Sequence, residues 1–268
     1  MTLYLSPLPS KKEIETYYKT NFTYTVVPAT VKRLRQRAGH ILEKLKSLNP
    51  DGISLLDIGS GYGYFLEEAK KTYMEGVGLE PSKKMYSHSK KAGLQVVNSA
   101  LEDYHPKNKF DFITLIQIIE HVENPLQFLK KVETLMNKDA VLYIETPNLD
   151  SHLFHFEKES YTFLTPPDHL GIFSKKTFQE LLSRTNLEIL DVTTYSYPEH
   201  FMGVIKKILH SNPPLPSQTS FPSSTPPLSL SKKLKYILID TMIASLLYKI
   251  LNLNDKGTIL ELYIRKKK

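Results

Sequence analysis

The stretch LLDIGSGYGYFLEEAKK, residues 55–71, constrains the fold more than any other part of the chain. An apolar run ends near Asp57, and Gly59, Gly61 and Gly63 then lead into a helical pattern. Glycines are needed where a backbone turns tightly and lets a ligand approach the main chain closely. A strand, a glycine-rich turn and a helix in this order predict the ligand-binding edge of an open α/β sheet.

The flanking sequence continues an alternation of strands and helices. Apolar runs bounded by turn residues predict strands over 53–58, 76–80, 94–98, 110–117, 140–146, 187–195 and 259–268. Helical patterns cover 11–48, 64–71, 82–92, 125–136 and 174–184, the last capped by Ser174. Short connections between such elements indicate a parallel sheet with helices on both faces. We expect Pro28 and Gly39 to interrupt the first helical region, and the final strand to lie at the sheet edge.

Composition divides the chain into three predicted parts: an N-terminal helical cap (1–50), a central α/β domain (51–195) and a C-terminal cap (196–268). Residues 211–230 hold six of the 17 prolines together with many Ser and Thr residues, which predicts a flexible linker. The apolar stretch 236–251 predicts an amphipathic helix too short to span a bilayer core. Two interpretations of this helix remain open: a structural cap, or a peripheral contact with an anionic membrane.

The formal charge of +7 is unevenly distributed along the sequence. Residues 1–50 and 201–268 together carry +14, whereas residues 51–200 carry −7. This asymmetry indicates either solvated helix faces with a basic tail, or a basic surface that meets an anionic partner. The chain has no cysteine, which excludes disulfides and thiolate chemistry, and its first residues do not resemble a secretory signal. We therefore expect a cytoplasmic protein, with the inner face of a membrane as a possible peripheral contact.

Two acidic residues indicate the kind of cofactor. Glu80 ends the second predicted strand, where a carboxylate can bind both hydroxyls of a ribose. Asp57 stands two residues before the first glycine, where it would repel a pyrophosphate but would suit an ammonium and a sulfonium group. This pattern favours S-adenosylmethionine over a dinucleotide.

The run D-x-G-x-G-x-G at 57–63, Glu80 and the segment FDFITLIQIIEHVENP at 110–125 together resemble class I S-adenosylmethionine-dependent methyltransferases. Within that class, the resemblance is to a subgroup that includes ubiquinone-biosynthesis O-methyltransferases and bacterial small-molecule methyltransferases. It covers about residues 50–195. The resemblance implies a doubly wound, mostly parallel, seven-stranded Rossmann-like sheet with a reversed final hairpin, to which we expect a helical cap to be added.

The resemblance also implies roles for individual residues. The three glycines would line the methionine part of the cofactor, with Asp57 supporting their loop, and Glu80 would bind the ribose. The segment 98–102 would contact adenine, and Gln117 would lie close to the cofactor. The residues expected to bind the cofactor are Asp57, Gly59, Gly61, Gly63, Glu80, Ser99, Ala100, Leu101 and Gln117.

Two histidines are candidates for catalysis. His121 follows the fourth predicted strand and could act as a general base, or could pack beneath the cofactor or cap the next helix. His169 lies in a segment similar to the P-x-H-L-x-x-F-S segment of these methyltransferases, which implies substrate contact or a role as base. The long segment 151–174 predicts an aromatic lid over a substrate. No metal site is predicted, because the spacing of the potential ligands in this region is not typical of one: His152, His155, Asp168 and His169.

These observations predict an enzyme that methylates an oxygen of a small or lipid-linked molecule, such as a quinone precursor or a cell-envelope sugar. Aromatic residues near the predicted rim favour an apolar or ring-shaped acceptor: Tyr17, Tyr18, Phe22, Tyr24, Phe154 and Phe156. One alternative is a nucleic-acid methyltransferase, although no nucleic-acid-binding module is visible and such a partner is not favoured. A further alternative is a non-catalytic binding protein that kept the fold. The sequence leaves open the acceptor, the accepting atom, the base and the oligomeric state.

Overall fold

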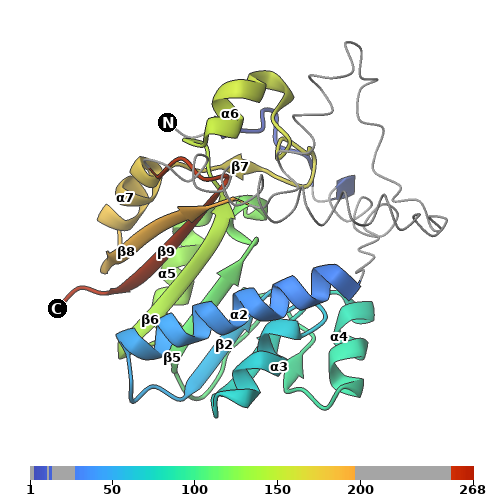
Figure 1. Ribbon diagram of the computed structural model, residues 1–268, viewed down its shortest axis with the longest axis vertical. Coiled ribbons are helices and arrows are strands. Elements are labelled where there is room, and N and C mark those ends of the chain that lie inside the picture. The colour runs from blue at the N-terminus through green and yellow to red at the C-terminus, as the bar shows by residue number, and fades with distance from the viewer. Residues whose placement is uncertain (1–2, 11, 14–27, 197–254) are drawn as a thin grey trace, which may run out of the picture.

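The computed structural model of the protein describes residues 3–10, 12–13, 28–196 and 255–268. A seven-stranded sheet forms its centre, with the strand order β4-β3-β2-β5-β6-β9-β8 (Figure 1). Its strands are β2 (Ser54–Ile58), β3 (Glu75–Leu79), β4 (Val96–Val97), β5 (Phe110–Ile116), β6 (Met136–Pro147), β8 (Leu187–Tyr195) and β9 (Ile259–Lys266). The helices are α2 (Pro28–Leu48), α3 (Tyr64–Lys71), α4 (Lys83–Lys91), α5 (Pro125–Leu135), α6 (His152–Glu157) and α7 (Lys175–Ser183), with 3-10 turns η1 (Ile119–His121) and η2 (Lys158–Ser160).

The sheet is mostly parallel, as predicted. β2 through β6 pair in parallel, whereas β9 runs antiparallel to both β6 and β8. The reversed final hairpin implied by the resemblance is therefore confirmed. The expectation that the final strand lies at the edge is wrong, because β9 is inserted between β6 and β8. Residues 259–264 are buried, because an interior position in the sheet covers both faces of this largely apolar strand.

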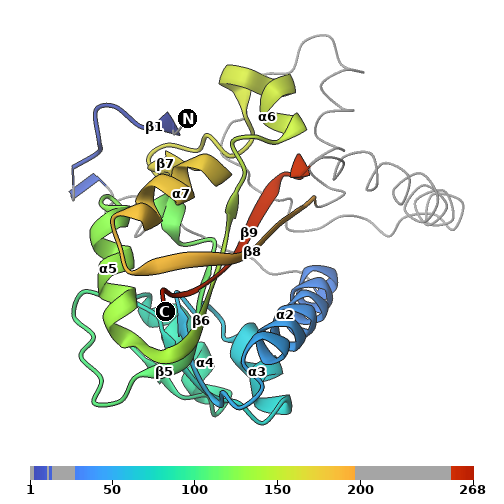
Figure 2. The same ribbon diagram turned by 90° about the vertical axis from the view of Figure 1, so that its left-hand side faces the viewer.

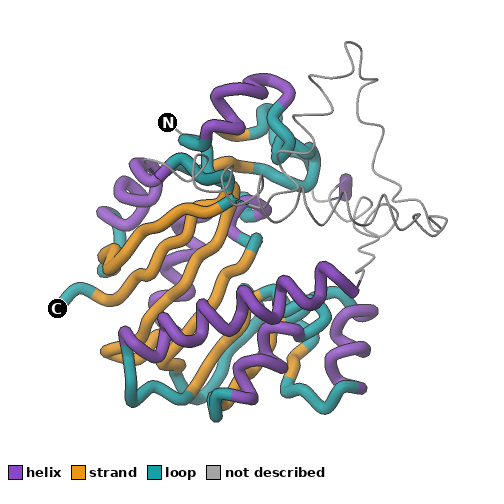
Figure 3. Tube along the Cα trace, in the orientation of Figure 1, coloured by secondary structure: helices purple, strands orange, loops and turns teal. Residues whose placement is uncertain are grey.

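Helices cover both faces of the sheet (Figure 2). On one face, α5 and α7 pack on a core that includes Ile113 and Leu115 of β5. On the other face, α2 and α3 pack on a core that includes Phe112 of the same strand. Figure 3 shows the strands as one twisted layer between these two groups of helices. Successive residues of β5 thus point to opposite cores, which confirms a doubly wound sheet.

Helix α2 differs from the sequence expectation. It begins at Pro28, a residue suited to the first helical position, and runs through Gly39 without a break. A single glycine costs a helix about 1 kcal/mol. Burial of Ala38, Ile41 and Leu42 against the sheet offsets that cost. The predicted interruption at Gly39 is therefore wrong.

The segment after β6 forms a small unit at the carboxyl end of that strand (Figure 1). Its short strand β7 (Gly171–Ile172) pairs antiparallel with β1 (Leu3–Tyr4). Leu149, Leu153 and Tyr161 are buried in a separate core of this unit. Because Phe154 packs at the edge of that core and Tyr161 is within it, these rings stabilise the segment itself, whereas Phe156 is exposed.

Several predictions fall on residues 14–27 and 197–254, which lie outside the described residues. They concern the linker 211–230, the helix 236–251 and the aromatic residues between 17 and 24. The division of the chain into three parts also stays a prediction. Among the helices that are described, none is both long and apolar enough to cross a membrane.

Candidate active site

The glycine-rich turn connects β2 to α3, and its backbone requires glycine. Gly59, Gly61 and Gly63 have φ angles of 76°, 54° and 81°, in the left-handed region that L side chains rarely adopt. A Cβ atom at Gly59 would lie 2.1 Å from Cδ1 of Ile118. A Cβ atom at Gly61 would meet nothing within 4 Å, so the main chain there is open to an approaching ligand. This turn can therefore hold a ligand against its backbone.

Glu80 braces the glycine turn. Its Oε2 accepts a hydrogen bond from the Gly61 N–H at 2.8 Å, and its Oε1 accepts one from the Ser82 N–H at 2.7 Å. Burial raises the pKa of Glu80, although these two hydrogen bonds lower it in part. A carboxylate has about four acceptor sites, so it can still accept both hydroxyls of a ribose. The expected role of Glu80 fits this geometry.

Asp57 is buried beneath the same turn. Its carboxylate accepts a hydrogen bond of 2.7 Å from the hydroxyl of Thr114, the residue opposite it on β5. Burial raises the pKa of Asp57 to about 7, the Thr114 hydrogen bond opposes this rise, and the charge of Glu80 adds to it. A cation placed nearby would favour the ionised form, which is what an ammonium group of a cofactor would supply.

The segment after β4 is attached to Glu80. Asn98 donates from its side-chain amide to the carbonyl oxygens of Glu80 and Pro81, at 2.8 and 3.0 Å. Ser99 donates to the Ala100 carbonyl at 2.8 Å, and Leu101 is buried in the core. The stretch expected to contact adenine thus lies next to the carboxylate expected to bind the ribose. Its role in adenine binding stays a prediction.

Gln117 has an unusual backbone conformation at the end of β5. Its φ is 56°, which is uncommon for a residue other than glycine. Its N–H donates to the Glu145 carbonyl at 2.8 Å, and its side-chain Nε2 donates to Glu145 Oε1 at 3.3 Å. The next residue, Ile118, is the one that a side chain at Gly59 would strike. The ends of β2, β5 and β6 therefore meet around Gln117.

His121 and His169, the two candidate catalytic residues, lie side by side. Their ring centroids are 4.8 Å apart in an edge-to-face arrangement. Nδ1 of His121 bonds to the Asp168 carbonyl at 2.9 Å, and Nδ1 of His169 bonds to the Phe163 carbonyl at 2.7 Å. Because Nδ1 donates to a carbonyl in both rings, Nε2 is the nitrogen of each ring that can take a second proton or, in the neutral ring, bind a ligand.

The two histidines have opposite electrostatic environments. Burial lowers the pKa of His121, but the Asp168 hydrogen bond and the charges of Glu120 and Asp168 outweigh it and raise the pKa to about 9. Burial, followed by the charge of His121, lowers the pKa of His169 to about 4. Without a ligand, His121 is therefore the charged, doubly protonated ring at neutral pH, and His169 is the neutral ring.

Glu120 completes this cluster, and no sequence pattern assigned it a role in the site. It is fully buried, and burial raises its pKa to about 7. Its Oε2 accepts a hydrogen bond from Thr146 at 3.0 Å, whereas its Oε1 has no hydrogen-bond partner in the described structure. The ligand atoms of Glu120, His121 and His169 all lie within 4.8 Å of one another. Two imidazoles and a carboxylate at these distances could hold a divalent metal ion.

Of the four metal-ligand candidates considered from the sequence, the described structure places only His169 in this group. His155 bonds through Nδ1 to the Ser151 carbonyl at 2.8 Å within α6. Asp168 instead contacts His121, with 3.2 Å between its Oδ1 and the imidazole Nδ1. A sequence signal for the Glu120 cluster exists only in part: Glu120 and His121 are adjacent, but their proximity to His169 is a property of the fold.

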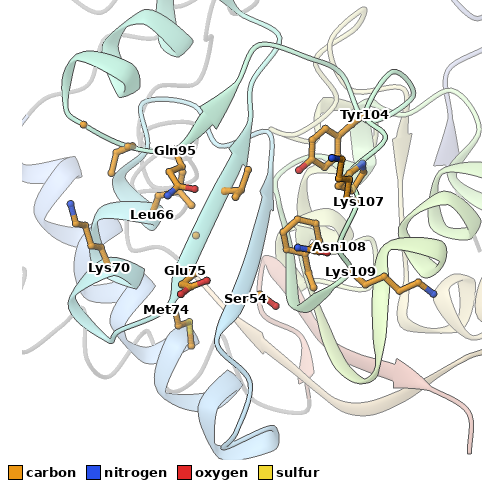
Figure 4. A pocket seen from close by; sticks show the side chains of 16 residues that line it. Ser54, Leu66, Lys70, Met74, Glu75, Gln95, Tyr104, Lys107, Asn108 and Lys109 are labelled. Carbon is orange, nitrogen blue, oxygen red and sulfur yellow. The ribbon is translucent and has the colours of Figure 1, made fainter.

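A cavity of about 720 Å³ lies elsewhere on the molecule (Figure 4). Ser54, Glu75 and Phe110, which begin β2, β3 and β5, lie along it, so it sits at the amino ends of these strands. Ligands of open α/β sheets bind at the carboxyl ends. The cavity is therefore separate from the candidate active site.

The glycine turn, the carboxylate after the second strand and the reversed hairpin together define the class I S-adenosylmethionine-dependent methyltransferases. A methyltransferase domain family model matches residues 30–192, and the chain belongs to this family. The class expected from the resemblance is thereby confirmed, and with it S-adenosylmethionine as the cofactor of the class.

Curated relatives include both O- and N-methyltransferases. The ubiquinone biosynthesis O-methyltransferase of Rhodopseudomonas palustris (strain TIE-1) is 26% identical over 133 residues, which are 47% of this chain and 53% of the relative. The chain thus matches about half the length of that relative. The same-named enzyme of Pelagibacter ubique (strain HTCC1062) is 29% identical over 59% of this chain and 77% of its own length. The (S)-coclaurine N-methyltransferase of Papaver somniferum is 28% identical, over 54% of this chain and 46% of its own length.

Solved structures share the fold over nearly the whole chain. The plantazolicin methyltransferase BpumL in complex with SAH has a TM-score of 0.54 at 16% identity, covering 97% of this chain and 91% of that one. A possible histamine N-methyltransferase of Thermotoga maritima has a TM-score of 0.53 at 19% identity, covering 96% and 95%. At these identities the similarity shows the fold alone.

Proposed function

We propose that the protein transfers a methyl group from S-adenosylmethionine to an oxygen of a small or lipid-linked molecule, such as a quinone precursor or a cell-envelope sugar. The observation that carries this proposal is the link between the glycine turn and the histidine pair. Ile118, whose side chain lies against Gly59, directly precedes η1 (Ile119–His121), which ends at His121. A cofactor on the turn and an acceptor at the histidines would therefore be neighbours.

The residues of the turn match the chemistry of the cofactor. When bound, S-adenosylmethionine supplies a methyl group on a positively charged sulfur. Glu80 would accept hydrogen bonds from the ribose while it holds Gly61 in place. Asp57 would place a negative charge beneath the turn, near the cationic part of the cofactor. Gly61 allows this close approach because nothing lies within 4 Å of where its Cβ atom would be.

The histidine pair would receive the acceptor. As the new carbon–oxygen bond forms and the carbon–sulfur bond breaks, the acceptor hydroxyl must lose its proton. The neutral ring of His169 would accept this proton, because His121 already carries one, and His121 and Glu120 lie beside it. The carbonyls of Asp168 and Phe163 fix the orientation of the two rings. Fixed rings can align the acceptor oxygen with the methyl group, and such alignment supplies a large part of the rate in reactions of this type.

An acceptor screen tests the proposal. Radiolabelled S-adenosylmethionine is incubated with an extract of the source cells and the purified protein, with Asp57→Ala as the control. Label that enters the organic phase would identify a lipid or quinone-like acceptor, whereas label in the aqueous phase would identify a sugar or another polar metabolite. Product analysis then separates methylation at oxygen from methylation at nitrogen, a choice made relevant by the N-methyltransferase relatives.

Two results would contradict the proposal. Label found in nucleic acid would show that the acceptor is a nucleic acid and not a small molecule. If S-adenosylhomocysteine bound to the protein but no label was transferred to any fraction, a non-catalytic binding protein would be the better description. Contact with anionic membranes is part of the same proposal, and it rests on segment 232–251 of the sequence, outside the described residues. Co-sedimentation with anionic vesicles, with and without that segment, tests it.

A further inference from the structure

Gln117 must be held by its surroundings, because its backbone adopts a conformation that few residues other than glycine tolerate. Gln117 follows β5 and donates two hydrogen bonds to Glu145 on the neighbouring strand β6. One comes from its main-chain N–H and one from its side-chain amide. An ionised carboxylate can only accept hydrogen bonds, so Glu145 must face the NH₂ group of the Gln117 amide. The amide oxygen of Gln117 then points to the other side and is available as an acceptor.

Glu145 is itself a buried charge that needs compensation. Its side chain is 3% exposed. Its Oε2 accepts a hydrogen bond from the Tyr143 hydroxyl at 3.0 Å, and Nε of Arg37 lies 3.6 Å from the same oxygen. A buried carboxylate without a cation nearby is costly. Arg37 compensates this charge and holds the Glu145 side chain beside the Gln117 amide.

Arg37 comes from the middle of α2, far from the glycine turn along the sequence. Its guanidinium group also forms an ion pair with Glu261 of β9 and lies over the ring of Tyr195, 3.9 Å from the ring centroid. The Tyr143 hydroxyl lies between the two carboxylates, 3.0 Å from Glu145 Oε2 and 2.7 Å from Glu261 Oε1, and can donate its single proton to either of them. These contacts hold Arg37 in one position, so it can hold the Glu145 carboxylate in one position as well.

We infer that Arg37 and Glu145 are positioning residues for the cofactor site: Arg37 holds the Glu145 carboxylate in place, and Glu145 orients the Gln117 amide so that its oxygen faces the cofactor. A carbonyl oxygen at this point is suited to a cofactor that carries an ammonium and a sulfonium group. The inference rests on the proposed function in one respect, the location of the cofactor beside Gln117. Neither Arg37 nor Glu145 is expected to touch the acceptor.

The test measures the affinity for S-adenosylhomocysteine by calorimetry, which needs no acceptor. Arg37→Met is expected to raise the dissociation constant roughly tenfold, the effect of one misplaced hydrogen bond to a charged group. Arg37→Lys keeps the charge without the planar fork and should have a smaller effect. Lys44→Met is the matched control, because Lys44 lies on the same helix and pairs with Asp191, away from Gln117.

A double-mutant cycle separates positioning from general stability. If Arg37 acts through Gln117, then Arg37→Met should weaken binding in the wild type but not in a Gln117→Ala background. Additive effects of the two substitutions would overturn the inference, as would a Lys44→Met variant that lost as much affinity as Arg37→Met. Should Arg37→Met fail to fold, Glu145→Gln replaces it in the same cycle. A wild-type protein that binds no S-adenosylhomocysteine would instead contradict the proposed function itself.

Discussion

Asp57 and Thr114 are opposite each other on β2 and β5, and the threonine hydroxyl donates a 2.7 Å hydrogen bond to the buried carboxylate. Thr114 is fully buried, and Asp57 is 3% exposed. A carboxylate in this position is costly to ionise, yet its charge suits a cationic cofactor. The ionised carboxylate of Asp57 therefore lowers the stability of the cofactor-free protein but favours binding of the cofactor.

The stability of the ligand-free protein should accordingly depend on Asp57 and on pH. Burial raises the pKa of Asp57 to about 7; the Thr114 hydrogen bond opposes this rise and the charge of Glu80 adds to it. The folded protein therefore keeps a proton on Asp57 at pH values where the unfolded chain, with the ordinary pKa of 3.8, has lost it. The contribution of Asp57 to the free energy of unfolding is therefore present at acidic pH and declines as pH rises toward 7.

Asp57→Asn tests this dependence. Its stability relative to wild type should increase by about 3 kcal/mol between pH of about 5 and about 8, as measured by urea unfolding. The same variant should bind S-adenosylhomocysteine more weakly. Parallel stability curves for the two proteins across this pH range would show that the pKa of Asp57 is not raised.

Gly59→Ala should damage the turn. The new Cβ would lie 2.1 Å from Ile118 Cδ1, in a backbone conformation with φ of 76°. We expect a loss of about 1–3 kcal/mol in stability and loss of the rise in melting temperature that S-adenosylhomocysteine causes in the wild type.

Gly39→Ala is the matched control for that substitution. Gly39 lies within α2 and has open space where a Cβ would be, so the change should leave binding intact and stabilise the helix by about 0.5–1 kcal/mol. Adding Ile118→Val to Gly59→Ala removes the clashing Cδ1 and should restore part of the stability. Normal cofactor binding by Gly59→Ala alone would contradict a site on this turn.

Glu80→Gln should weaken cofactor binding. Each carboxylate oxygen of Glu80 accepts a backbone N–H, and a glutamine would place an NH₂ group against one of them. We expect the dissociation constant for S-adenosylhomocysteine to rise roughly 10- to 100-fold. Glu75→Gln, an exposed acid at the other end of the same strand, should leave it unchanged. Equal affinities of wild type and Glu80→Gln would rule out the ribose contact.

When no acceptor is bound, Glu120, His121 and His169 offer three ligand atoms to a divalent transition metal. Added Co²⁺ should give visible absorption bands that report coordination by these side chains, and chelation should remove them. Glu120→Gln and His169→Gln should abolish the bands. His40→Gln, at a histidine whose side chain is 74% exposed, should not change them. Bands that persist in both cluster variants would place the metal elsewhere, and their absence in the wild type would leave the histidines to act without a metal.

The sequence by itself determined the elements of the central sheet and the residues of the glycine turn. Local patterns were sufficient there because a strand buried on both faces must be apolar, and because only glycine tolerates the left-handed backbone of the turn. The strand Leu187–Tyr195 was predicted with its observed bounds, and the helix Lys175–Ser183 was predicted within one residue at each end. Local signals were sufficient here too, because β-branched residues favour a strand and Ser174 caps the helix.

Only the tertiary structure decided how distant residues meet. The insertion of β9 between β6 and β8, the unbroken course of α2 through Gly39, and the approach of His169 to Glu120 all depend on contacts between segments far apart in sequence. The contacts of Arg37 also depend on the tertiary structure. The sequence places Arg37 on a helix without indicating a partner, and the fold brings it into ion pairs with Glu145 and Glu261. Periodicity specifies which face of an element is apolar, but the charges that pair across elements are set by packing.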